Sequence, residues 1–137
     1  MITKEALHKK SSQELTALLY EACLDHLETA KEAITQKDYV VVNEKLQKAI
    51  DILHRLGAGI NYEAGIVADQ LDALYNYMAD RLVVANYEKS IEIIDEVIKP
   101  LEELAVAWQK AMVTNSDAQS KSLKRQASAY EQSMMYE

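Results

Sequence analysis

Apolar residues along this chain recur at intervals of three and four positions, the spacing of helices rather than the alternation of half-buried strands. Glycine and proline are rare, with 3 Gly and 1 Pro among 137 residues, so few positions interrupt a helix. The pattern predicts an all-α fold: an antiparallel, up-down four-helix bundle with an accessory C-terminal tail or short helix.

Turn and capping residues divide the first half into two helices. Ser11 and Glu14 have the spacing of a capping box, which predicts that the first helix begins near Ser11 and ends near Gln36. Asp38 follows a polar stretch and is expected to cap a second helix that ends before Gly57. These two helices form a helical hairpin.

The three glycines fall in one short stretch, at positions 57, 59 and 65, where positive φ angles are tolerated and a helix would lose stability. We therefore expect one substantial loop there. The third helix is predicted from about Glu63 to Ala85, and Asn86 is expected to adopt a left-handed or capping conformation.

The fourth helix is predicted from Tyr87 to about Val113, with a kink or break near Pro100, because proline lacks an N–H and clashes with the preceding turn. Beyond it the chain is rich in serine, although apolar residues keep a helical spacing. We expect residues 1–113 to form the helical-bundle domain and residues 114–137 an accessory tail.

Charge and composition limit the classes of partner and the location that we expect. The formal net charge of −7 disfavours nucleic acid and anionic membranes, whose binding usually needs a basic face. Charged residues interrupt every apolar run before the roughly twenty residues that span a bilayer. Cys23 is the one cysteine, and residues 1–4 do not resemble a signal peptide, so we expect a reducing, cytoplasmic location.

The apolar residues exceed what one core needs. On the third predicted helix, Ile66, Ala73, Tyr77 and Val84 form a second line beside the main stripe. Ile93, Val97 and Leu104 broaden the stripe of the fourth helix, and Tyr20, Leu24 and Leu27 add to a first-helix stripe at Leu15, Leu19 and Ala22.

Two interpretations of this surplus remain open. The extra residues could form a groove for an amphipathic helix of a partner. Alternatively they pack in the core, or are covered by a terminal segment, which periodicity alone favours because bundles often carry wide faces.

One stretch carries a family resemblance. Residues 74–86 read Leu-Tyr-Asn-Tyr-Met-Ala-Asp-Arg-Leu-Val-Val-Ala-Asn and match the pattern Leu-Tyr-x-Tyr-x-x-x-Arg-Leu-x-x-Ala-Asn. Supporting matches lie at residues 14–24, 43–49 and 107–111. From about Ser11 to Met112 the chain resembles the flagellin export chaperones of the FliS family.

The resemblance implies a chaperone that binds the C-terminal part of newly made flagellin, prevents premature polymerisation and delivers it to the flagellar export apparatus. It implies neither ATP use nor covalent catalysis. The chain departs from the family in two places: it lacks the N-terminal Asn-Pro-Tyr-x-x-Tyr-like segment, and its tail extends beyond the match.

Combining the resemblance with the surplus apolar residues predicts the client contacts: Tyr20, Leu24, Ile66, Tyr77, Val84, Ile93, Val97 and Leu104. Arg81 either orders a local polar contact or touches the client. The competing hypothesis is a structural bundle that self-associates into a homodimer.

Other chemistry has little support in the sequence. A two-metal bundle site needs two Glu-x-x-His motifs, and the chain has one, Glu5 to His8, before the first predicted helix. The glycines lack the Lys or Ser of a nucleotide-binding loop or nucleophile elbow. We expect no enzyme activity, metal or cofactor.

Overall fold

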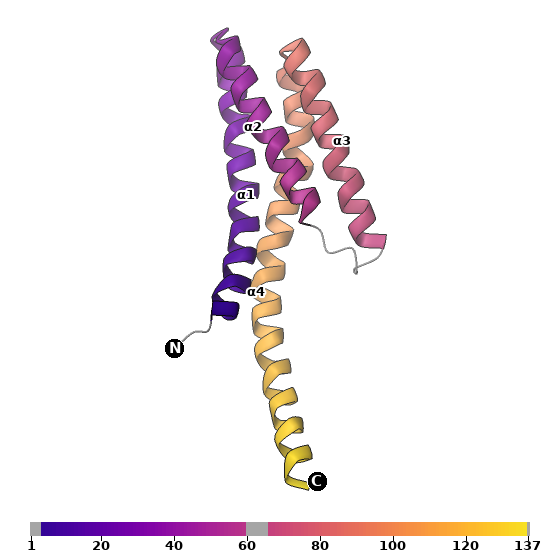
Figure 1. Ribbon diagram of the computed structural model, residues 1–137. Helices are drawn as coiled ribbons and strands as arrows, with labels where there is room; N and C mark the ends of the chain where they lie inside the picture. The colour runs from indigo at the N-terminus through magenta and orange to yellow at the C-terminus, as the bar shows by residue number, and fades with distance from the viewer. Residues whose placement is uncertain (1–3, 60–65, 137) are drawn as a thin grey trace. The chain divides into compact units, whose positions relative to one another are not determined.

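The computed structural model describes the backbone of residues 4–59 and 66–136, and the side chains of residues 13–59 and 68–113. Four helices follow one another: α1 (Lys4–Thr35), α2 (Tyr39–Ala58), α3 (Ile66–Glu88) and α4 (Ile91–Tyr136) (Figure 1). The predicted all-α, four-helix architecture is confirmed.

The chain divides into two compact units, residues 1–105 and 106–137. In the first unit, α2 packs beside both α1 and α3. The tight turn between α1 and α2 and the tight turn between α3 and α4 lie at the same end of this unit (Figure 1). The start of α4 is joined to α1 by a Lys31–Asp95 ion pair of 2.7 Å and to α3 by an Arg81–Glu96 pair of 3.2 Å. Each helix of this unit therefore has two neighbours, and α1 lies diagonally across from α3.

The second unit consists of the rest of α4 through Tyr136 and the last residue. The predicted division between residues 113 and 114 stays a prediction.

An apolar seam runs along each helix of the first unit. In α2 the buried seam residues are Val42, Leu46, Ala49, Leu53 and Leu56, separated by four, three, four and three positions. This spacing suits helices packed nearly antiparallel, with side chains of one inserted between those of the next. Full burial of each Leu or Ile contributes roughly 1.5–3 kcal/mol, so the seams supply the main stabilisation.

One polar contact crosses this core. Tyr20 of α1 and Tyr75 of α3 are both buried, and their hydroxyl groups are hydrogen-bonded to each other. Burial raises the pKa of both phenols, because the tyrosinate form would lose its hydration. One hydroxyl donates and the other accepts, so the pair ties together two helices that lie diagonally across the bundle.

The turn after α1 uses a lysine in the left-handed region. Lys37 has a φ of 59°, and the Asp38 N–H donates to the carbonyl of Ala33 at 2.9 Å, as in a Schellman turn. The Asp38 carboxylate then accepts from the Val41 N–H at 3.4 Å, so the predicted cap of the second helix is confirmed.

The turn after α3 repeats this construction. Lys89 has a φ of 54°, the Ser90 N–H donates to the Ala85 carbonyl at 3.1 Å, and the Ser90 hydroxyl accepts from the Ile93 N–H at 3.2 Å. The expectation that Asn86 ends the helix was therefore wrong. Asn86 stays helical and donates to Asn43 of α2 at 2.8 Å.

Two other helix limits differ from the prediction. α1 begins at Lys4, seven residues before the capping box, because the residues around Ser11 are good helix formers and serine costs a helix interior little. α4 runs through Pro100 without a break and continues past Val113 to Tyr136, so the predicted end near Val113 was wrong and the kink at Pro100 stays a prediction.

Gly57 has a different role from the one expected. It lies inside α2 and is buried, and a Cβ there would approach the Asp72 carboxylate oxygen of α3 to 3.2 Å. Its small size allows α2 and α3 to pack closely, and no positive φ is involved. The predicted start of the third helix at Glu63 and the third glycine, Gly65, lie outside the described residues.

Substituting the left-handed lysines tests the turns. Lys37→Gly should raise the free energy of unfolding by about 0.5 kcal/mol, because relief of the left-handed penalty exceeds the added entropy of the unfolded chain. Lys89→Gly should gain less, because Lys89 also donates to Asn86 at 2.6 Å and lies 5.9 Å from the Tyr39 ring centroid. Urea unfolding measures both; equal gains would contradict a role for those contacts.

The tyrosine pair predicts a coupling and a pH dependence. Tyr20→Phe or Tyr75→Phe alone should cost about 1–3 kcal/mol by leaving one buried hydroxyl without a partner, and the double substitution should cost less than the sum. Because folding raises both pKa values, the pair contributes fully to the free energy of unfolding below about pH 10, the tyrosine pKa in the unfolded chain. This contribution is lost at higher pH.

Chemical unfolding of the four proteins between neutral pH and pH 11 measures both effects. The double variant should lose stability less steeply above pH 10 than the wild type does. Additive single losses with identical alkaline slopes would show that the two hydroxyls are not coupled.

Candidate partner-binding face

The surface between α3 and α4 carries the polar and apolar residues of the most specific sequence motif. α3 turns Tyr75, Met78 and Leu82 into the core. Tyr77, Arg81 and Val84 follow at i, i+4 and i+7, so they share one side of the helix. The Arg81–Glu96 ion pair of 3.2 Å shows that this side faces α4.

This ion pair also shows which residues of α3 and α4 lie at the same height along the bundle. Because α3 and α4 are antiparallel, residues that precede Arg81 lie level with residues that follow Glu96, and Leu104 falls toward the Tyr77 end of the face. Tyr77 is 59% exposed, whereas Val84 and Leu104 are half-buried. We call Tyr77, Arg81, Val84, Glu96 and Leu104 the α3–α4 face.

Three of the other predicted contacts are core residues. Tyr20, Ile93 and Val97 are buried, with Val97 only 1% exposed. They do not widen an exposed stripe, because α4 uses a broad set of apolar residues to pack against its neighbours. Their place in the core corrects the expectation that they are surplus.

Of the two remaining predicted contacts, Leu24 lies elsewhere and Ile66 cannot be placed. Leu24 is half-buried on α1, seven residues before Lys31, so it lies on the side of α1 that faces Asp95 of α4. The side chain of Ile66 lies outside the described residues. Of the predicted set, the structure thus places Tyr77 and Val84 on the side of α3 that carries Arg81, and Leu104 on the neighbouring α4.

Arg81 makes the local polar contact that the sequence left open. Its guanidinium spans from α3 to Glu96 of α4, and the pair is partly exposed, so its direct contribution to stability is small. The Nε atom is buried and has no hydrogen-bond partner in the described part of the chain. One N–H donor on this face therefore remains unsatisfied.

Sequence reasoning also missed exposed apolar residues. On α1 it reversed the two stripes: Tyr20 and Leu27 are buried, whereas Leu15 is 55% exposed and Leu18 is exposed too. Among the described side chains of the first unit, the other large exposed apolar residues that were missed are Tyr39 and Val40 on α2, and Val83 and Tyr87 on α3. Apolar periodicity could not separate these from core positions, because both recur at helical spacing.

The described side chains contain no group of three or more His, Cys, Asp and Glu arranged to hold a metal ion. The Glu5–His8 motif lies outside them. In the described part of the chain, no helix is long and apolar enough to cross a membrane.

Comparison with known proteins agrees with the sequence motif. The family described as flagellar protein FliS matches residues 3–115. Relatives named flagellar secretion chaperone FliS include one from Salmonella typhimurium, 34% identical over 109 residues, which cover 78% of this chain and 81% of the relative.

The same name is carried by a Bacillus subtilis relative, 34% identical over 99 residues, and a Vibrio cholerae relative, 30% identical over 105 residues. These alignments cover 72% and 76% of this chain, and 74% and 77% of the respective relatives. Motif, helical fold and similarity over most of the chain agree, and the chain belongs to the FliS family of flagellar secretion chaperones.

Proposed function

We propose that this protein is a cytoplasmic, non-enzymatic export chaperone that binds the C-terminal region of flagellin, prevents its premature polymerisation and delivers it to the flagellar export apparatus. The observation that carries the proposal is the α3–α4 face, where Tyr77 is exposed and Val84 and Leu104 are half-buried. Membership of a family whose relatives are named secretion chaperones supports it.

The α3–α4 face is suited to a partner because the bundle does not need it. The seams of α3 and α4 are filled by buried residues such as Met78, Leu82, Ile94 and Leu101. Tyr77 adds little to that core, since most of its side chain is exposed. Covering it with an amphipathic helix would remove apolar surface from water and stabilise a complex.

Polar groups on the same face can orient the client. The unsatisfied Arg81 Nε–H can donate to a carbonyl or carboxylate of a bound segment, and the Glu96 carboxylate holds the guanidinium in place. Such a hydrogen bond would form only with a correctly placed client and would favour that orientation. It would not by itself provide much affinity.

Binding of this kind is stoichiometric. A flagellin terminus that is unstructured before assembly must be ordered on the chaperone, which costs several kcal/mol that a long apolar contact can offset. While it is held, its apolar stripe cannot pair with other flagellins. The chaperone thus acts by covering the apolar surface of the flagellin segment, and it carries out no covalent step.

The alternative function is self-association, and a separate group of residues favours it. Tyr39, Val40 and Tyr87 are exposed at the end of the first unit that carries both tight turns, and Tyr87 is 90% exposed. Lys89 contacts both the Tyr39 ring and Asn86, so these residues lie near one another. Sedimentation of the protein alone would show a dimer if this end self-associates.

Calorimetric titration with a C-terminal flagellin segment tests the proposal. The wild type should bind one segment per chain, and Tyr77→Asp should weaken binding by at least about tenfold, because a carboxylate replaces apolar contact area. Tyr87→Asp, the same substitution on the same helix ten residues later, is the matched control and should bind like the wild type.

Unfolding curves should show that both variants keep the fold, since both tyrosines are exposed. Absence of binding by the wild type would contradict the chaperone function. Equal losses from Tyr77→Asp and Tyr87→Asp would contradict the placement of the client on the α3–α4 face.

A further inference from the structure

A hollow of about 200 Å³ lies on the opposite side of the first unit, between α1 and α2. It is lined by His26 of α1 and by Lys48, Asp51, Ile52 and Arg55 of α2. None of these residues belongs to the α3–α4 face. Ile52 is buried and provides an apolar floor under charged side chains.

Two basic side chains, Lys48 and Arg55, line this hollow in a chain whose net charge is −7. The Arg55 guanidinium has no ion-pair partner among the side chains that the structure describes. Lys48 contacts Glu44 at 3.1 Å, but this is an exposed i,i+4 pair that contributes little and can rearrange. Asp51 is the one acidic residue in the lining.

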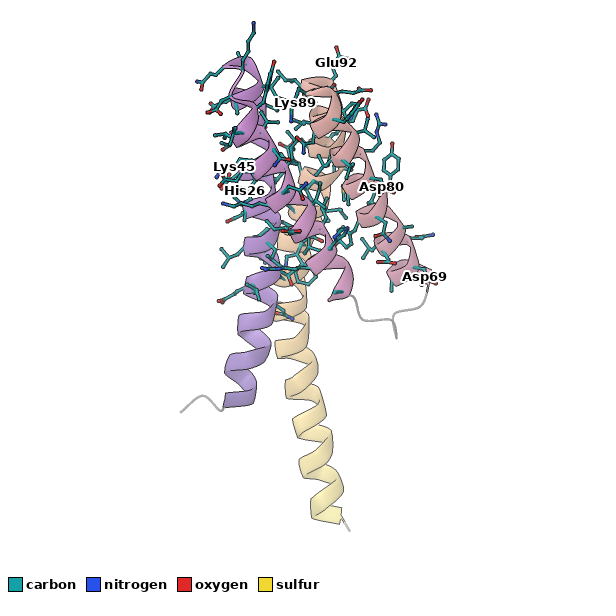
Figure 2. All side chains as sticks on the ribbon, turned by 45° about the horizontal axis from the view of Figure 1, so that its top comes forward. His26, Lys45, Asp69, Asp80, Lys89 and Glu92 are labelled. Carbon is teal, nitrogen blue, oxygen red and sulfur yellow. The ribbon has the colours of Figure 1, made fainter. Side chains whose placement is uncertain are left out.

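His26 responds to the positive charge of this region. Its pKa is lowered, first by burial and then by Lys45 and Lys48, while Asp25 and Glu44 act in the opposite direction. Figure 2 shows His26 of α1 and Lys45 of α2 next to each other (Figure 2). Burial is thus the main cause of the lowered pKa, and the two nearby lysines add to it.

An apolar strip on α1 leads to the hollow. Leu15, Leu19, Ala22 and His26 follow at i, i+4, i+7 and i+11 and therefore share one side of the helix. Leu15 is exposed, and Leu19 and Ala22 are half-buried. A ligand that used both the strip and the hollow would need apolar groups at one end and negative charge at the other.

We propose that the α1–α2 side is a second binding site, for an amphipathic peptide segment of a partner protein whose acidic end enters the hollow and pairs with Arg55 and Lys48. Arginine recognises a carboxylate with two parallel hydrogen bonds, which suits Glu or Asp side chains. A small inorganic anion would use the charges and leave the apolar strip uncovered. The site would let a second protein bind while the α3–α4 face holds its client.

A synthetic helical peptide tests this site without flagellin. The probe carries leucines at i, i+4 and i+7 with glutamates in the next turn, and the matched probe has glutamine in place of every glutamate. The glutamate peptide should bind the wild type, and Arg55→Gln should weaken it about tenfold, the loss expected for one charge-assisted pair. Lys99→Gln makes the same charge change on α4 and should leave binding unaltered.

The pH dependence of binding supplies an independent readout. Bound carboxylates should raise the pKa of His26, whose facing charges are Asp25 on α1 and Glu44, Lys45, Lys48, Asp51 and Arg55 on α2. Because the pKa of the free imidazole lies below its ordinary value, affinity for the glutamate peptide should rise as the pH falls below about 6.5. His26→Gln should remove this rise.

Two results would overturn the proposal: equal affinities for the glutamate and glutamine peptides, or unchanged binding by Arg55→Gln. Tyr77→Asp should bind the glutamate peptide like the wild type. Failure of this site would leave the proposed flagellin binding untouched, because the two experiments use different ligands and different faces.

Discussion

The arrangement of the first unit depends on the apolar seams that close the core between four antiparallel helix segments. Buried residues at alternating intervals of four and three, as in α2, fill this core, and the Tyr20–Tyr75 hydrogen bond ties α1 to α3 across it. Because such a pair is satisfied only when both hydroxyls meet, it disfavours a shifted packing of these helices. A core fixed in this way leaves the outer sides of the helices available for binding.

Helix number, order and overall fold class could be predicted from sequence because they depend on local chemistry. The apolar spacing separates helices from strands, and the Asp38 cap uses the hydrogen bond that its position suggests. The motif at residues 74–86 identified the family. In the structure this motif includes both core residues, such as Tyr75 and Leu82, and the exposed Tyr77.

The site was predicted less completely, because periodicity shows that two residues share a helix side and does not show which side faces inward. On α1 the choice between two adjacent stripes was reversed, and on α4 Ile93 and Val97 proved to be core. Tertiary contacts also overrode local preference at the turns, where Lys89 adopts the left-handed conformation and contacts Asn86 and Tyr39. The basic hollow is formed by two helices and has no contiguous sequence signal.

The central claim is that the closed bundle binds its client on the α3–α4 face. Methyl NMR spectra of the labelled protein, recorded with and without the C-terminal flagellin segment, test it most directly. Binding on this face should give large shifts for the Val84 and Leu104 methyl groups and little change for the fully buried Leu27 and Leu53. Large shifts at Leu27 and Leu53, or shifts confined to Leu15 and Leu18 of α1, would contradict it.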